Sequence, residues 1–167
     1  DERHNVCYSK DHAILSVIYE DGTEEFVPEK YDNIRVAHVF PEPGRHVVKL
    51  RLSNAATTLD NMFSIVYWAA EEYLTTADFS HTDLSGITNM ESMFENCKHL
   101  ETCVFGKVNT PELKNIKNMF KYCYALRSVD IASLQTDKVT DMSGLFFNCS
   151  SLERLDLTGF MTNSVTD

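Results

Sequence analysis

Carboxylates are the side chains of this sequence whose type and spacing point most directly to chemistry. Asp78, Asp130 and Asp156 share one phase of a 26-residue interval, with Val104 at the intervening position. If the interval builds stacked strands, neighbouring positions lie about 4.8 Å apart. Such a strip could bind a basic partner or a calcium ion, and two carboxylates about 5–10 Å apart could serve glycoside cleavage. Alternatively, each aspartate binds backbone amides of its own turn, as aspartate does readily.

The other reactive side chains form no recognisable catalytic or metal-binding motif. The sequence has no G-x-S-x-G, H-E-x-x-H or CxxC motif, and its 6 histidines are scattered. His38 and His46 could face each other across a hairpin and bind a metal, but such pairs more often belong to a half-exposed sheet. Cys103 could be a reactive thiol, but no histidine shares its phase. We therefore predict a non-enzymatic protein with no catalytic residue, no metal site and no cofactor.

A 26-residue repeat must position the carboxylates. A Met-Phe or Leu-Phe pair, a cysteine and a leucine each recur at this interval. Self-similarity at a fixed period of this length is typical of a solenoid, in which each unit buries its apolar side on its neighbours. A solenoid offers an extended surface, so recognition is the default function. The recurring residues are Met93-Phe94, Met119-Phe120 and Leu145-Phe146; Cys97, Cys123 and Cys149; and Leu100, Leu126 and Leu152.

Two periodicities alternate within each unit. From Leu100 to Phe105 the sequence has the form L-x-x-(apolar)-x-(apolar), which predicts a short strand with one buried face. From Met90 to Cys97 apolar residues fall at i, i+3, i+4 and i+7, which predicts one stripe of a short helix. Thr88 stands where the N-cap of that helix belongs. The expected fold class is therefore α+β, with one strand and one short helix per repeat.

The unit resembles the 26-residue leucine-rich repeat of bacterial surface proteins, the BspA-like type. The typical unit of that family reads L-x-x-L-D-L-S-x-F-x-T-x-x-V-T-x-M-S-x-M-F-x-x-C-x-S, and Leu152–Asp167 with the preceding Val139–Leu152 follows it closely. The resemblance covers residues 74–167, with the last repeat incomplete. One period before Met93-Phe94 stand Tyr67-Trp68, so residues 57–73 are expected to be a degenerate repeat that forms a capping helix.

Residues 1–56 lack the repeat and show strand signals. Ala13–Tyr19 is apolar and β-rich, Asp21-Gly22 is a strong hairpin signal, and His46–Leu52 alternates between apolar and polar residues. This segment is therefore expected to be a small antiparallel β module. Its Glu20–Thr23 turn and later His38–Leu50 run resemble the PKD-like β-sandwich, although Tyr19-Glu20 replaces the usual Trp-Gly. The alternative is a generic β-cap on the solenoid.

Charge and hydropathy exclude several classes of partner. The formal net charge of −10 argues against a nucleic acid or an anionic membrane, because both require clustered Lys and Arg. No apolar stretch approaches the length of a membrane-spanning helix. We therefore expect neither nucleic-acid binding nor membrane insertion.

The BspA-like resemblance implies a bacterial or protist adhesion module, exposed at the cell surface or secreted, that binds a protein or glycan ligand. The expected site is the exposed strand face of the solenoid. The alternative is a structural spacer or assembly module of a larger repeat protein. Self-association through an open C-terminal repeat is possible, because Ser164–Asp167 matches Lys138–Asp141, midway through a unit. The candidate binding residues are Asp78, Glu101, Thr102, Arg127, Ser128, Asp130, Glu153, Arg154 and Asp156.

Overall fold

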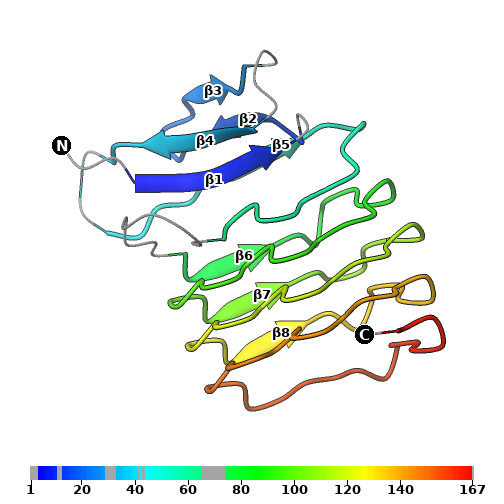
Figure 1. Cartoon of the computed structure of the whole chain (residues 1–167). Coiled ribbons are helices and arrows are strands. Elements are labelled where there is room, and N and C mark those ends of the chain that lie inside the picture. Colours follow the sequence, from blue (N-terminus) through cyan, green and yellow to red (C-terminus); the bar gives the residue numbers. More distant parts are fainter. Residues whose placement is uncertain are drawn as a thin grey trace.

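The computed structural model describes residues 4–10, 13–28, 33–40, 42, 44–64 and 74–166. A β-rich module lies at one end of a stack of parallel coils, and the C-terminus lies at the other end (Figure 1). The strands are β1 (His4–Lys10), β2 (Ile14–Ile18), β3 (Glu24–Phe26), β4 (Asn33–His38), β5 (Lys49–Leu52), β6 (Thr76–Asp78), β7 (Thr102–Val104) and β8 (Ser128–Asp130).

The N-terminal module consists of two antiparallel sheets. One sheet pairs β1 with β4, and the other has the order β3-β2-β5. The β2–β3 hairpin turns at Gly22, whose amide donates to the Tyr19 carbonyl at 3.0 Å and whose φ of +84° suits glycine. Ile14 and Val17 of β2 are buried, and so is Val36 of β4. The two sheets thus share an apolar interior.

The module is attached to the first coil by backbone and side-chain contacts. The Tyr8 amide of β1 donates to the Met62 carbonyl at 2.7 Å, and Lys10 Nζ lies 2.8 Å from an Asp60 carboxylate oxygen. Burial of Asp60 opposes its ionisation, but hydrogen bonds from Lys10 and Thr58 outweigh that effect and lower its pKa. β1 is therefore bonded to the first coil at both Tyr8 and Lys10.

Two parallel ladders hold the coils together. On one side β6, β7 and β8 pair in the register Thr76↔Thr102↔Ser128, which is the 26-residue period of the sequence. On the other side Thr58, Asn89, Asn115 and Asp141 form successive parallel bridges. Each coil is thus bonded to the next on both sides of a common core.

The predicted helix of each repeat is wrong, and so is the α+β fold class, because the part of the chain that the structure describes is all β and turns. In the stretch Thr88–Cys97, the amides of Met90, Ser92 and Phe94 each donate at 2.9 Å to a carbonyl of the next coil. These amides are unavailable for the i→i−4 bonds of a helix. Ser92 and Asn96 also have left-handed φ values of 53° and 64°, which a right-handed helix excludes. The result is a series of tight turns.

The first coil also differs from the expectation for residues 57–73. Residues 60–63 form a turn, and residues 65–73 of the expected capping helix, with Tyr67-Trp68, lie outside the described residues. The Met-Phe position is taken by Met62-Phe63, because Thr58 pairs with Asn89 at an offset of 31 rather than 26 residues. The Phe63 ring stacks on Phe94 with a centroid distance of 5.2 Å. An insertion of five residues therefore separates this coil from the regular ones.

Stacked phenylalanines form the core of the coils. Phe63, Phe94, Phe120 and Phe146 lie one above the other at centroid distances of 5.2, 5.3 and 5.5 Å, with ring planes within 7° of parallel. A second, shorter stack joins Phe79 to Phe105. The apolar positions that suggested a helical stripe thus point inward from consecutive turns.

The recurring cysteines bond to this stack. Cys97 Sγ donates to the Phe63 carbonyl at 3.2 Å, and Cys123 Sγ donates to the Phe94 carbonyl at 3.1 Å. Cys149 repeats the contact one coil further along, at 3.0 Å from the Phe120 carbonyl. None of the three forms a disulfide, and Cys97 and Cys123 are buried. A small side chain that is both apolar and a weak donor suits this position.

Candidate interaction surface

The exposed face of β6, β7 and β8 carries its side chains in columns that run along the stack. In each strand the central residue is buried and its two neighbours point outward, so Ala77, Cys103 and Val129 face the core. One outward column contains Thr102 and Ser128 and continues through the bridge from Ser128 to Arg154.

A second outward column contains the aspartates. Asp78, Val104 and Asp130 are register partners, so one valine separates the first two carboxylates. Asp156 lies two residues beyond Arg154, in the coil below β8. Because Val104 interrupts the column, Asp78 and Asp130 are not direct neighbours, and their mutual repulsion is reduced.

Two of these aspartates bind their own turns. Asp78 Oδ1 accepts a hydrogen bond from the Ser80 amide, and Asp156 Oδ1 accepts one from the Thr158 amide, each at 2.9 Å. The hydrogen bonds from Ser80 and Thr158 lower the pKa values of the two carboxyl groups. These carboxylates therefore stabilise their own turns and are also exposed to solvent.

A third column alternates in charge. Glu101, Arg127 and Glu153 stand immediately before the strand positions, and all three side chains are exposed. The Arg127 amide donates to the Glu101 carbonyl at 2.9 Å, and the Glu153 amide donates to the Arg127 carbonyl at 3.4 Å. Opposite charges on successive coils attract weakly across such a ladder. The structure thus places all nine predicted residues on one face, in three adjoining columns.

The thiol and the two histidines considered as alternatives lie in the core of the coils and in the N-terminal module. Cys103 is fully buried, and burial raises the pKa of its thiol well above the ordinary value. The Phe40 ring contacts both His38 and His46, at centroid distances of 4.9 and 4.3 Å. Within the described ranges, no group of three or more His, Cys, Asp or Glu side chains could hold a metal ion.

His46 instead joins two turns of the N-terminal module. Its Nδ1 lies 2.5 Å from the Glu20 carboxylate, and its Nε2 lies 2.8 Å from the Glu42 carbonyl. Both partners are acceptors, so the protonated imidazolium, which donates from both nitrogens, fits them best. The hydrogen bond to Glu20 raises the pKa of His46 and lowers that of Glu20.

Two further surface features have no counterpart among the predicted site residues. A polar hollow of about 250 Å³ lies between β5 with the residues that follow it and the loop after β6, with Arg51, Asn54, His81 and Asp83 in its lining. An exposed aromatic group near β8 includes Tyr124 and Phe147. The sequence itself indicates the aromatic group, because the corresponding positions of the other repeats are polar.

Fold and surface together define a class: short stacks of parallel β-coils with a polar, accessible strand face and a separate β module at one end. Residues 57–167 of the 167-residue chain match the family model described as "Mycoplasma protein of unknown function, DUF285". The chain therefore belongs to the DUF285 family. No curated protein and no solved structure matches it. The BspA-like and PKD-like resemblances stay predictions.

No helix in the described part of the chain is long and apolar enough to cross a membrane.

Proposed function

We propose that the chain is a non-enzymatic interaction module, exposed at a cell surface or secreted, that binds a macromolecular ligand through its strand face. The observation that carries this proposal is the alignment of nine polar side chains in three columns over β6–β8 and the following coil. A rigid parallel ladder holds these groups at fixed spacing, which reduces the ordering cost of binding. The BspA-like resemblance adds adhesion as the biological role.

The charge of the face favours a basic partner. Its nine residues include five carboxylates and two guanidinium groups, and the whole chain has a net charge of −10. A negative potential over an accessible surface accelerates encounter with a positive partner and repels a negative one. We therefore expect a protein ligand with a basic patch, bound more weakly as the salt concentration rises.

The proposal of a non-enzymatic role is supported by the state of the candidate groups. The carboxylates of Asp78 and Asp156 accept hydrogen bonds within their turns, and Cys103 is buried. None of Asp78, Asp130 and Asp156 lines the hollow at β5. This hollow therefore does not bring a substrate to those three carboxylates.

A binding array of matrix proteins tests the proposal. The purified chain is expected to bind at least one basic protein saturably, and Asp130→Asn with Asp156→Asn is expected to weaken that binding about tenfold. The matched control is Asp83→Asn with Asp137→Asn, which removes the same charge from exposed positions outside the three columns. If both double variants weaken binding equally, the loss reflects the net charge of the chain and not the strand face. Unchanged binding by the strand-face variant would contradict the proposed site.

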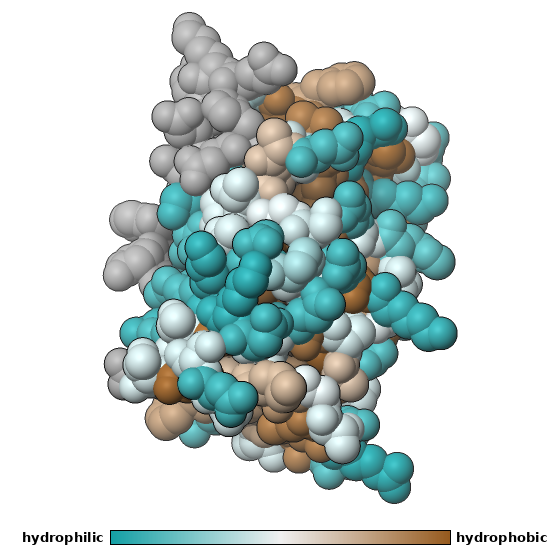
Figure 2. Space-filling model, turned by 90° about the vertical axis from the view of Figure 1, so that its right-hand side faces the viewer, coloured by the Kyte–Doolittle hydropathy of each residue, from teal (hydrophilic) through white to brown (hydrophobic). Residues whose placement is uncertain are grey.

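A second candidate role is that of a spacer or assembly module. The coil beyond β8 exposes Leu155, Leu157 and Met161, by 37%, 42% and 54%. Apolar side chains also reach the surface at the lower end of the stack in Figure 2. This apolar surface would be covered by a further coil or by a second copy. Sedimentation velocity tests self-association: concentration-dependent dimers that Leu157→Lys abolishes would support this role, and monomers at all concentrations would contradict it.

A further inference from the structure

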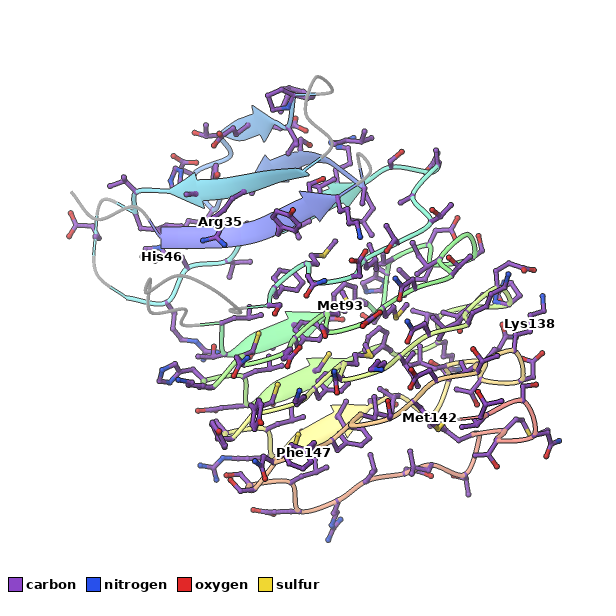
Figure 3. All side chains as sticks on the ribbon, in the orientation of Figure 1. Arg35, His46, Met93, Lys138, Met142 and Phe147 are labelled. Atoms are coloured by element: carbon purple, nitrogen blue, oxygen red, sulfur yellow. The ribbon has the colours of Figure 1, made fainter. Side chains whose placement is uncertain are left out.

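Three aromatic side chains gather on the surface near β8, and we call them the aromatic corner: Tyr122, Tyr124 and Phe147. The Tyr122 ring lies 5.6 Å from Phe147 in an edge-to-face arrangement and 6.0 Å from Tyr124. Tyr124 is 41% exposed and Phe147 is 52% exposed. Figure 3 shows Phe147 in the lower part of the stack, beside the strand side of the coils. Large aromatic side chains exposed together are typical of interaction sites.

The repeat itself shows that the fold does not require these aromatic residues. All three positions are occupied by polar side chains in the neighbouring coils, which have the same backbone path. The aromatic corner is therefore an addition to one region of a regular scaffold. The counterparts are Asn96 and Asn148 for Tyr122, Lys98 and Ser150 for Tyr124, and Glu95 and Lys121 for Phe147.

Tyr122 occupies a position whose left-handed backbone conformation is unfavourable for a tyrosine. Its φ is 63°, and its counterparts Asn96 and Asn148 have φ values of 64° and 58°. Asparagine tolerates the left-handed region, whereas a bulky residue there is an outlier. Such strained residues persist chiefly where they contribute to function. A partly exposed ring contributes little to the core, so packing does not explain the tyrosine.

The aromatic corner is rigidly held and locally neutral. The Tyr122 amide donates to the Phe147 carbonyl at 2.8 Å, and the Tyr124 amide donates to the Tyr122 carbonyl at 3.0 Å. Lys121 Nζ lies 5.3 Å from the Tyr122 ring centroid and 3.1 Å from a Glu95 carboxylate oxygen, so its charge is paired. The backbone that carries the rings is thus held in place, and the cation beside the Tyr122 ring is neutralised by Glu95.

We propose that the aromatic corner binds a neutral carbohydrate. The C–H face of a pyranose is apolar and stacks on an aromatic ring, while its hydroxyls need donors and acceptors at the rim. No hydrogen bond within the described residues uses the Tyr122 or Tyr124 hydroxyl, and the Asn148 side chain is exposed beside them. The net charge of −10 disfavours an acidic glycan. An extended peptide would need a groove or a sheet edge, and the rings stand on an exposed turn.

Titration calorimetry with triacetylchitotriose, cellotriose and mannotriose tests this site. At least one trisaccharide is expected to bind saturably, with saturation transfer from the tyrosine ring protons to the sugar in NMR. The repeat supplies the matched substitutions Tyr122→Asn, Tyr124→Ser and Phe147→Lys, which place the residues of neighbouring coils at these positions. The triple variant is expected to bind at least tenfold more weakly, with an unchanged circular dichroism spectrum.

The control separates this inference from the strand-face proposal. Asp130→Asn with Asp156→Asn should leave trisaccharide affinity unchanged, because neither residue belongs to the aromatic corner. Absence of binding for all three trisaccharides would overturn the inference, as would equal affinity in the triple variant. Binding of a proline-rich peptide at these rings without sugar binding would also overturn it.

Discussion

At the scale of single residues, the cysteine of each repeat links side-chain chemistry to coil stacking. The thiols of Cys97, Cys123 and Cys149 each donate to the carbonyl of a stacked phenylalanine in the preceding coil. A leucine would fill the space without offering a donor, and a serine would bring a more strongly hydrated group into the core. Cysteine satisfies the carbonyl at a small desolvation cost.

Cys123→Ala should therefore destabilise the chain by about 1–2 kcal/mol, through one lost hydrogen bond and a small cavity. Urea unfolding monitored by circular dichroism measures the difference. The matched variant Cys149→Ala should cost less, because Cys149 is only half-buried. An equal loss of stability in the two variants, or a larger loss in Cys149→Ala, would contradict a role for burial at this position.

His46 predicts a pH-dependent contribution to stability. Its pKa is raised by the hydrogen bond to Glu20, so the contribution is fully present below the ordinary value of 6.5 and is lost as the pH rises through the raised pKa. The pKa of Glu20 is lowered, so the same contact is lost again in strong acid. Thermal unfolding of His46→Gln and wild type should differ most near pH 6 and converge at alkaline pH. A constant difference between pH 6 and 9 would contradict the imidazolium contact.

At the scale of elements, the repeat predicted the strands better than the turns. The alternating pattern after each leucine predicted which residues of β7 and β8 face the core, because a two-residue periodicity indicates a strand with one buried face. The i, i+3, i+4, i+7 pattern was ambiguous, since consecutive tight turns bury the same positions as a helix. Left-handed residues such as Ser92 and Asn96 distinguish the two, and the asparagine near the end of two of the units, Asn96 and Asn148, was the available signal.

The offset of the first coil was also missed at this scale. Leu59-x-x-Met62-Phe63 repeats the spacing of Met90-x-x-Met93-Phe94, but at 31 rather than 26 residues. A constant period of 26 residues assigned the Met-Phe position of this coil to Tyr67-Trp68 instead. The aromatic stack identifies the correct pair, because the Phe63 and Phe94 rings lie within 7° of parallel.

The phenylalanine stack should contribute a large part of coil stability. Phe120 is fully buried between Phe94 and Phe146, so Phe120→Ala should cost about 3–5 kcal/mol. Phe146→Ala, at the half-buried end of the stack, should cost clearly less. Urea unfolding of both variants tests the difference, and a cost below about 1 kcal/mol for Phe120→Ala would contradict a continuous stack.

At the scale of the whole molecule, the chain is a one-dimensional stack with different surfaces around it. Each coil contacts mainly its neighbours, as in other repeat proteins, and β1 is bonded to the first coil. Within the described part of the chain, the outward side chains of β7 and β8 stay exposed or half-exposed. The columns on the strand face were predictable from the repeat phase, and the aromatic corner is visible in the sequence only as a departure from the repeat. The His46 contact depends on tertiary geometry that the period does not encode.

The central claim is that the strand face is the macromolecular binding site. Hydrogen–deuterium exchange of the chain, with and without the tightest-binding protein from the array, tests it most directly. We predict slower exchange at residues 101–104, 127–130 and 153–156 in the complex, with little change in the turn stretches 88–97 and 114–123. Protection confined to the turn stretches or to β1–β5, with unchanged exchange at β7 and β8, would contradict the claim.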